Sequence, residues 1–224
     1  MRENKTGKYF KYAIGEILLV VIGILIALQI NNWNERRIKG HAEIQFYKNT
    51  KQQLLDDVQN LTSQRSYNSK YMNEFNNAIK LIGDNDRSQK DSLGKIAMNI
   101  TRYSDFDRQG NIYETTVNSG DIKLLRNVEI IDGLRRLEET YMYLNRMESI
   151  HFDAIMSMVP DLKQAMRFTT VEVENENMLY TYEFQNLFAL SIKIMIEKEE
   201  IYDRALSEID AIISLMENEI EQAK

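Results

Sequence analysis

The sequence predicts an all-α protein in which one N-terminal transmembrane helix is followed by an elongated, up-and-down helical bundle. Three observations lead to this prediction. A single strongly apolar stretch, residues 12–33, lies near the start of the 224-residue chain. In the polar remainder, apolar residues recur at spacings of three and four, which is the period of a helix. One proline and nine glycines are present in the whole chain, so the punctuation of a β-sandwich or barrel is missing.

The apolar stretch has the length of a membrane span. Residues 17–28 form an unbroken run of twelve residues without a polar side chain. A helix from Tyr12 to Trp33 would be about 33 Å long, enough to cross a hydrocarbon core of roughly 30 Å. Tyr9 and Tyr12 at one end and Trp33 at the other are expected to anchor the span at the headgroups. Residues 27–31 make a poor signal-peptide cleavage site, so we expect the anchor to be retained.

The charges around the span indicate its orientation. Four basic residues precede it, namely Arg2, Lys5, Lys8 and Lys11, and three follow it. Because only residues 1–11 precede the span, the simplest interpretation is a short cytoplasmic tail and an exported C-terminal domain. Residues 1–39 carry a net charge of +4, which suits an anionic lipid surface. The rest carries −10, which argues against nucleic acid as a partner. The lack of cysteine excludes disulfides and is compatible with a periplasm.

One face of the predicted span is distinctive. It follows a 4-3-4-3 spacing through Glu16, Val20, Gly23, Ala27 and Ile30. Gly23 and Ala27 form a small-xxx-small pair, which lets another helix approach closely. Glu16 has two interpretations: a buried carboxylate in an oligomer that serves as a proton or ion site, or a side chain that reaches the headgroups and pairs with Lys8 or Lys11. The second is simpler, and both stay open.

Two segments resemble a known family. Residues 7–35, GKYFKYAIGEILLVVIGILIALQINNWNE, resemble the N-terminal signature of a group of uncharacterised membrane proteins of Gram-negative Bacteroidota, a domain of unknown function. Residues 113–127, YETTVNSGDIKLLRN, resemble more loosely that family's internal helix–Ser-Gly–helix segment. The resemblance implies one N-terminal span, a helical remainder and an inner-membrane location. It implies no activity.

The extracytoplasmic domain is predicted to cover residues 42–224, after a linker at residues 34–41 in which Gly40 is the only helix breaker. Alternatively, the membrane helix continues as a single rod. The first helix of the domain is predicted for residues 42–82. Its heptad-like stripe consists of Tyr47, Lys51, Leu54, Val58, Leu61, Arg65, Asn68, Met72, Phe75, Ile79 and Ile82. The polar members are expected at a poorly buried edge or paired within the bundle.

The second pass is predicted to be broken. Residues 90–103 and 111–118 should form short helices, the latter capped by Gly120 in the left-handed conformation. Asn127 is a plausible N-cap for a long helix that Pro160 kinks or ends.

The rest of the chain completes four passes. Residues 168–177 alternate enough for a short extended piece, but we expect a loop. The last helix is predicted for residues 179–221, with a stripe formed by Leu187, Leu190, Ile194, Ile201, Ile209, Ile212, Met216 and Ile220. Four stripes with polar outsides favour a four-helix bundle.

No catalytic, nucleotide-binding or metal signature is present, so we expect no enzyme, cofactor or metal. His41 and His151 lack zinc spacing, and Glu148–His151 is one Glu-x-x-His pair where a di-iron bundle needs two. We expect His151 at the core edge or in solvent, and the acidic run 197–203 on a solvated face. Four tyrosines, Tyr141, Tyr143, Tyr180 and Tyr182, are candidates to line a small-molecule cleft.

These observations favour a membrane-anchored interaction or scaffold protein. Its expected partners are the lipid bilayer and either a second copy of the chain or an envelope membrane protein. Two alternatives remain: a periplasmic ligand-sensing bundle that acts through a membrane partner, and an ion-coupling subunit that uses Glu16.

Overall fold

The structure is a computed structural model that describes residues 5–107 and 110–223, with side chains from residue 14 onward. The described chain is almost entirely helical, so the predicted all-α class is confirmed. It divides into two units, residues 1–47 and residues 48–224.

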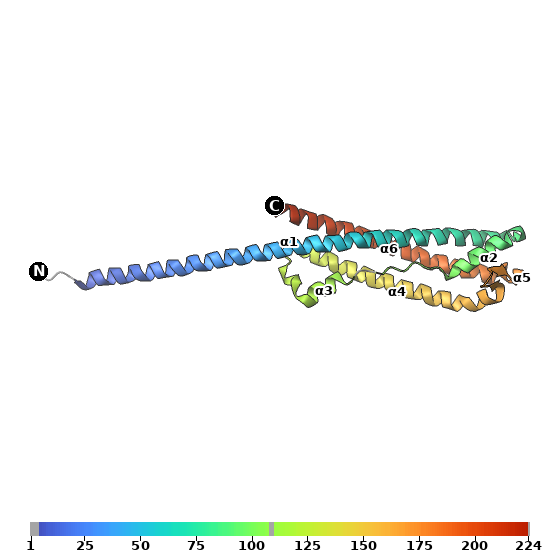
Figure 1. Cartoon of the computed structure of the whole chain (residues 1–224), viewed down its shortest axis with the longest axis horizontal. Coiled ribbons are helices and arrows are strands. Elements are labelled where there is room, and N and C mark those ends of the chain that lie inside the picture. Colours follow the sequence, from blue (N-terminus) through green and yellow to red (C-terminus); the bar gives the residue numbers. More distant parts are fainter. Residues whose placement is uncertain (1–4, 108–109, 224) are drawn as a thin grey trace. The chain divides into compact units, whose positions relative to one another are not determined.

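The first unit consists of the N-terminal part of helix α1 (Lys5–Gly83), a single helix of 79 residues. The helix passes through residues 34–41 without interruption, so the break predicted at Gly40 is wrong and the alternative of one continuous helix holds (Figure 1). One glycine costs a helix only about 1 kcal/mol relative to alanine. Its neighbours favour the helix, since Lys39 Nζ lies 2.6 Å from Glu35 Oε1 one turn away.

In the part of the chain that the structure describes, the second unit contains the rest of α1 and five further helices. They are α2 (Lys90–Met98), α3 (Ile112–Ser119), α4 (Val128–Ala165), the single turn α5 (Glu176–Leu179) and α6 (Tyr182–Gln222). Three 3₁₀ turns lie between them, η1 (Arg87–Gln89), η2 (Asn99–Thr101) and η3 (Asp121–Leu124). Strands β1 (Met166–Arg167) and β2 (Glu172–Val173) pair antiparallel, and β2 lies within residues 168–177, where we had expected a loop.

Within this unit the chain makes four alternating passes, as predicted. α1 and α4 run in one direction, and α6 returns in the other (Figure 1). Among the described residues, the second pass is α-helical in α2 and α3, and the 3₁₀ turn η2 follows α2. Between η2 and α3, residues 102–107 have no helical or strand structure, and we call this segment the strap.

Side-chain caps fix several helix starts. Asn127 Oδ1 accepts from the backbone N–H groups of Glu129 and Ile130, which confirms the predicted N-cap of α4. Gly120 has φ of 81° and caps α3, also as predicted. Thr181 caps α6, so the last helix, predicted for residues 179–221, begins at Tyr182 and follows the separate turn α5.

Pro160 lies inside α4, which continues to Ala165; the option that Pro160 ends the helix is therefore wrong. A proline removes one helical hydrogen bond. Met158, Leu162 and Ala165 flank this position and are buried in the core, and their packing keeps the helix intact.

The core follows the predicted stripe of α1 closely. Every seventh residue is buried, in the series Tyr47, Leu54, Leu61, Asn68, Phe75 and Ile82. The polar members Lys51 and Arg65 lie at the edge, as expected, and contact Glu217 and Asp203 of α6. The stripe predicted for α6 is correct at Ile194, Ile201, Ile209, Ile212 and Met216, but Leu190 is exposed.

Candidate functional site

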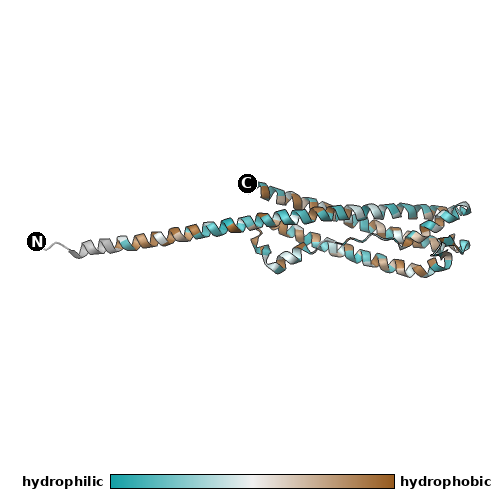
Figure 2. Cartoon of the chain, viewed as in Figure 1, coloured by the Kyte–Doolittle hydropathy of each residue, from teal (hydrophilic) through white to brown (hydrophobic). Residues whose placement is uncertain are grey.

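The apolar segment of α1 is exposed, and Figure 2 shows its hydrophobic residues in brown toward the N-terminus. Its large apolar side chains, from Ile14 to Ile30, are 44% to 72% exposed. An 18-residue window of the helix has a mean hydropathy of 2.3, and none of it is buried. A core helix of a soluble protein would bury such a window, so this part of α1 has the length and composition of a membrane span.

The predicted helix-packing residues Glu16, Val20, Gly23 and Ala27 are all exposed on α1. A Cβ atom added to Gly23 would meet no atom of the chain within 4 Å. Trp33 is 64% exposed, and the Arg37 guanidinium lies 5.6 Å from its ring centroid.

The structure does not describe the side chains of the other residues predicted to act in this region. Arg2 falls within residues 1–4, and the side chains of Lys5, Lys8, Tyr9, Lys11 and Tyr12 are not described. The two interpretations of Glu16 therefore both stand, because its proposed partners are among these lysines.

A buried polar cluster in the second unit was missed by the sequence analysis. Lys198 of α6 and His151 of α4 are fully buried, and Glu148 of α4 is 5% exposed. The predictions of a solvated acidic face at residues 197–203 and of a core-edge or solvated His151 are therefore wrong at Lys198 and His151.

The sequence did carry a signal for this cluster. Lys198 continues a regular 4-3 series of buried residues in α6, which includes Phe188, Ser191, Met195, Tyr202 and Ala205. Glu148 and His151 occupy the same kind of position in α4, between Leu144 and Ile155. A polar residue in register with a core stripe is thus buried by its neighbours, whatever its own preference.

The cluster holds the strap on the bundle through side-chain-to-backbone hydrogen bonds. Glu148 Oε1 accepts from the N–H of Phe106 at 2.8 Å, and Lys198 donates to the carbonyl of Ser104. From α1, Gln64 accepts from the N–H of Asp105 at 3.1 Å, and Asn60 donates to the carbonyl of Asp107 at 2.9 Å. An extended segment lacks a helix's internal hydrogen bonds, and these four contacts provide partners for four of its backbone groups.

Burial changes the acid–base properties of the cluster. It raises the pKa of the Glu148 carboxyl, and the Lys198 ammonium opposes that rise. It lowers the pKa of Lys198, against the attraction of the Glu148 and Asp105 carboxylates. Burial and the charge of Lys198 together lower the pKa of His151 to about 4. The imidazole is therefore neutral at pH 7, and neither of its nitrogens has a hydrogen-bond partner among the described residues.

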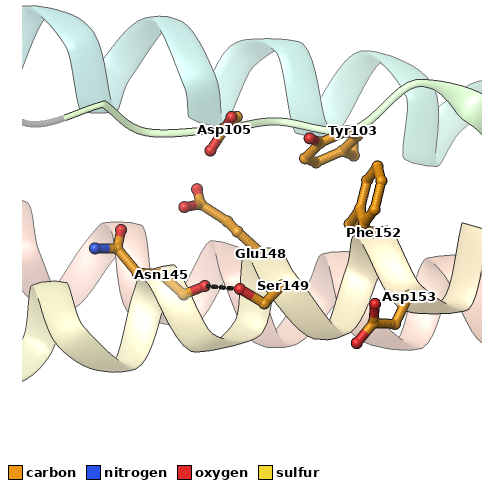
Figure 3. A pocket seen from close by; sticks show the side chains of 7 residues that line it. All are labelled: Tyr103, Asp105, Asn145, Glu148, Ser149, Phe152 and Asp153. Atoms are coloured by element: carbon orange, nitrogen blue, oxygen red, sulfur yellow. Dashed lines mark hydrogen bonds between the residues drawn. The ribbon is translucent and has the colours of Figure 1, made fainter.

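A pocket of about 500 Å³ opens between the strap and α4 (Figure 3). Tyr103 and Asp105 line it from the strap, and Asn145, Glu148, Ser149, Phe152 and Asp153 line it from α4. The carboxyl groups of Asp105 and Glu148 face each other across it, and the rings of Tyr103 and Phe152 lie beside them (Figure 3).

The predicted tyrosine cleft does not form. Tyr141 is buried and donates to Asp57, and Tyr143 donates to Glu197. Tyr180 donates to the carbonyl of Asp86 near the β-hairpin, while Tyr182 is 71% exposed. The aromatic residue that sequence reasoning overlooked is Tyr103, which lies on the strap and outside any helical stripe. In residues 5–107 and 110–223, no three His, Asp or Glu side chains converge as metal ligands.

Comparison with known proteins places the chain in a family. The profile of a family of unknown function (DUF6090) matches residues 16–197. The chain belongs to this family. The resemblance to a family of unknown function is thereby confirmed, and the DUF6090 match takes in the strap, Glu148 and His151. No curated protein and no solved structure matches the chain.

Proposed function

We propose that this chain is a non-catalytic, membrane-anchored interaction protein of a bacterial inner membrane. The apolar part of α1 crosses the bilayer, and its face with Glu16, Val20, Gly23 and Ala27 packs against a second membrane helix. That helix belongs to another copy of the chain or to an envelope membrane protein.

The observation that carries this proposal is the exposure of the segment Ile14–Ile30 on every side. Burying apolar area contributes roughly 25 cal/mol per Å², and no described part of the chain covers this segment. A lipid bilayer supplies that cover, and a span of this length suits it.

The small-residue face supports helix association within the bilayer. In lipid, helices associate through close van der Waals packing, and small residues permit it. The open space above Gly23 leaves room for a neighbouring helix. By contrast, Glu16 is exposed, and among the residues whose side chains are described no contact favours an ion-coupling role.

The proposed orientation places residues 1–11 in the cytoplasm and the domain of residues 42–224 in the periplasm. It is supported by the basic residues before the span and by the acidic character of the domain after it. The absence of cysteine suits an oxidising compartment.

The proposal is tested by the protein mass of the full chain in detergent. The wild-type chain should form a defined multiple of 26.4 kDa or bring down a stoichiometric membrane partner. Gly23→Ile should shift the protein to the monomer, because the larger side chain blocks close helix approach. Leu25→Phe, which adds volume on the opposite side of the same helix, is the matched control and should change nothing.

Since a side chain at residue 23 meets nothing in the chain itself, loss of assembly in Gly23→Ile would report an intermolecular contact. A wild-type monomer that captures no membrane protein would overturn the proposal. So would an oligomer that responds to both substitutions equally.

A further inference from the structure

We infer that the pocket between the strap and α4 binds a small organic cation, namely a primary ammonium group carried on a short apolar or aromatic stem. This site lies in the second unit and does not depend on how the anchor assembles.

The first argument is the state of the two facing carboxylates. Glu148 is 5% exposed, and both hydrogen bonds that it accepts, from Phe106 N–H and Tyr202 Oη–H, end on Oε1. No described residue donates a hydrogen bond to Oε2. The carboxyl group as a whole faces Asp105 across the pocket (Figure 3). The Lys198 ammonium is a countercharge for Glu148, but its hydrogen bond goes to the carbonyl of Ser104, so an ammonium group in the pocket would supply the donor for Oε2.

The second carboxylate completes the polar end of the pocket. The side chain of Asp105 faces Glu148 from the strap, and among the described residues no side chain donates to it (Figure 3). An ammonium has three donors, so it can bridge both carboxylates at once. The Lys198 ammonium attracts both carboxylates from inside the bundle. A second cation, bound in the pocket between them, would reduce the repulsion that remains.

The apolar end is formed by two rings. Tyr103 and Phe152 lie with ring centroids 5.9 Å apart, and Phe152 is 45% exposed. Aromatic rings attract cations and pack well against apolar stems. This arrangement of carboxylates beside aromatic rings favours an ammonium with a carbon stem over a bare inorganic cation.

Other ligand classes fit less well. An anion would meet Asp105, Glu148 and Asp153, and none of the described residues that line the pocket is basic. A metal ion would need three or more converging ligands, and the described residues offer no such group.

The site also joins the strap to α4. Asp105 belongs to the strap and Glu148 to α4, so a bridging ammonium would fasten the strap to the bundle. Ligand binding is therefore expected to raise the melting temperature of the chain, because it stabilises the folded state selectively.

The test is calorimetric titration of the full-length chain in detergent with 2-phenylethylammonium chloride. Its uncharged analogue 2-phenylethanol and its anionic analogue phenylacetate serve as matched ligands, and they control for partition into detergent. We expect saturable binding of the ammonium compound alone.

Two variants assign the binding to the pocket. Glu148→Gln keeps an acceptor for Phe106 and should weaken binding by about tenfold or more, since a desolvated charge pair is lost. Asp105→Asn, at an exposed position, should weaken it by roughly threefold. Glu139→Gln removes a carboxylate from an exposed ion pair on the same helix and should leave binding unchanged. If Glu148→Gln fails to fold, Asp105→Asn decides alone.

Absence of saturable binding up to roughly 10 mM, where affinity is negligible, overturns the inference. So does equal binding of the alcohol or of phenylacetate, or binding that neither pocket variant weakens. Stabilisation by calcium chloride that disappears in Glu148→Gln, without any effect of the ammonium compound, would identify a metal site instead.

Discussion

The two units have the same α-helical backbone but differ in where their apolar side chains lie. In the first, apolar side chains cover α1 on all sides and are exposed. In the second, they form one stripe that faces other helices. Polar residues follow the same contrast: Glu16 is exposed in an apolar segment, whereas Glu148 lies inside a bundle and accepts two hydrogen bonds. The surroundings of a carboxylate, rather than the helix that bears it, decide what it can do.

The largest effect is expected from the buried lysine. Lys198→Met should lower the free energy of unfolding by about 3 kcal/mol, because it leaves Glu148 buried without its countercharge. It also removes the donor to the carbonyl of Ser104. Denaturant unfolding followed by circular dichroism measures the change.

The control for this variant is Lys193→Met, an exposed lysine on the same helix, which should be nearly neutral. Adding Glu148→Gln to Lys198→Met should recover much of the loss, since the two groups act as a pair. Equal destabilisation by the single and double variants would show that their charges are not coupled.

The next effect concerns His151. His151→Leu should raise stability at pH 7 by about 1 kcal/mol, since it replaces two buried nitrogens that have no partner in the described chain. The unfolding free energies of both proteins at several pH values are the measurement.

The pH dependence has a defined sign. The pKa of His151 is about 4 in the folded state, below its ordinary value of 6.5. Between these values the unfolded chain binds the extra proton, so the wild type loses stability as pH falls from 6.5 to 4, by at most about 3 kcal/mol from this residue. The raised pKa of Glu148 acts in the opposite sense, but it is common to both proteins. The advantage of His151→Leu should therefore grow toward pH 4. An advantage that is constant with pH would contradict the buried, neutral imidazole.

The smallest effect tests the continuity of α1 between the two units. Gly40→Ala should stabilise the chain by about 0.5 kcal/mol, because alanine favours a helix and its Cβ would meet no other atom within 4 Å. Gly40→Pro should lower helicity and stability, since proline breaks a helix interior. If neither substitution changes the melting temperature, residues 34–41 do not form a stable helix and the continuity of α1 is contradicted.

Much of the fold could be predicted because local rules decide it. Asn127 caps a helix with its own side-chain oxygen, and Gly120 can adopt the left-handed conformation because it has no side chain. In α1, apolar residues that recur every seven positions specify the buried face. The continuity through Gly40 depends on a small energy difference, which explains why a single breaker misled the prediction.

The candidate site could not be predicted in the same way. The strap has no periodicity, and its backbone partners lie far away in the sequence, on α1, α4 and α6. Lys198 lies within a run of charged residues, which suggests a solvated face, and only its register with the core of α6 reveals that it is buried. The pocket depends on these long-range contacts, so it becomes visible only in three dimensions.

The contrast between the units is tested most directly by cysteine labelling, since the chain has no cysteine of its own. Leu19→Cys and Ser207→Cys place a thiol at exposed positions, one on the apolar segment and one on α6. In intact spheroplasts, a membrane-impermeant maleimide should label Ser207→Cys rapidly and leave Leu19→Cys unmodified until the protein is denatured. Labelling of both positions at similar rates would contradict a lipid-embedded α1. Protection of Ser207→Cys until the spheroplasts are lysed would contradict the proposed orientation.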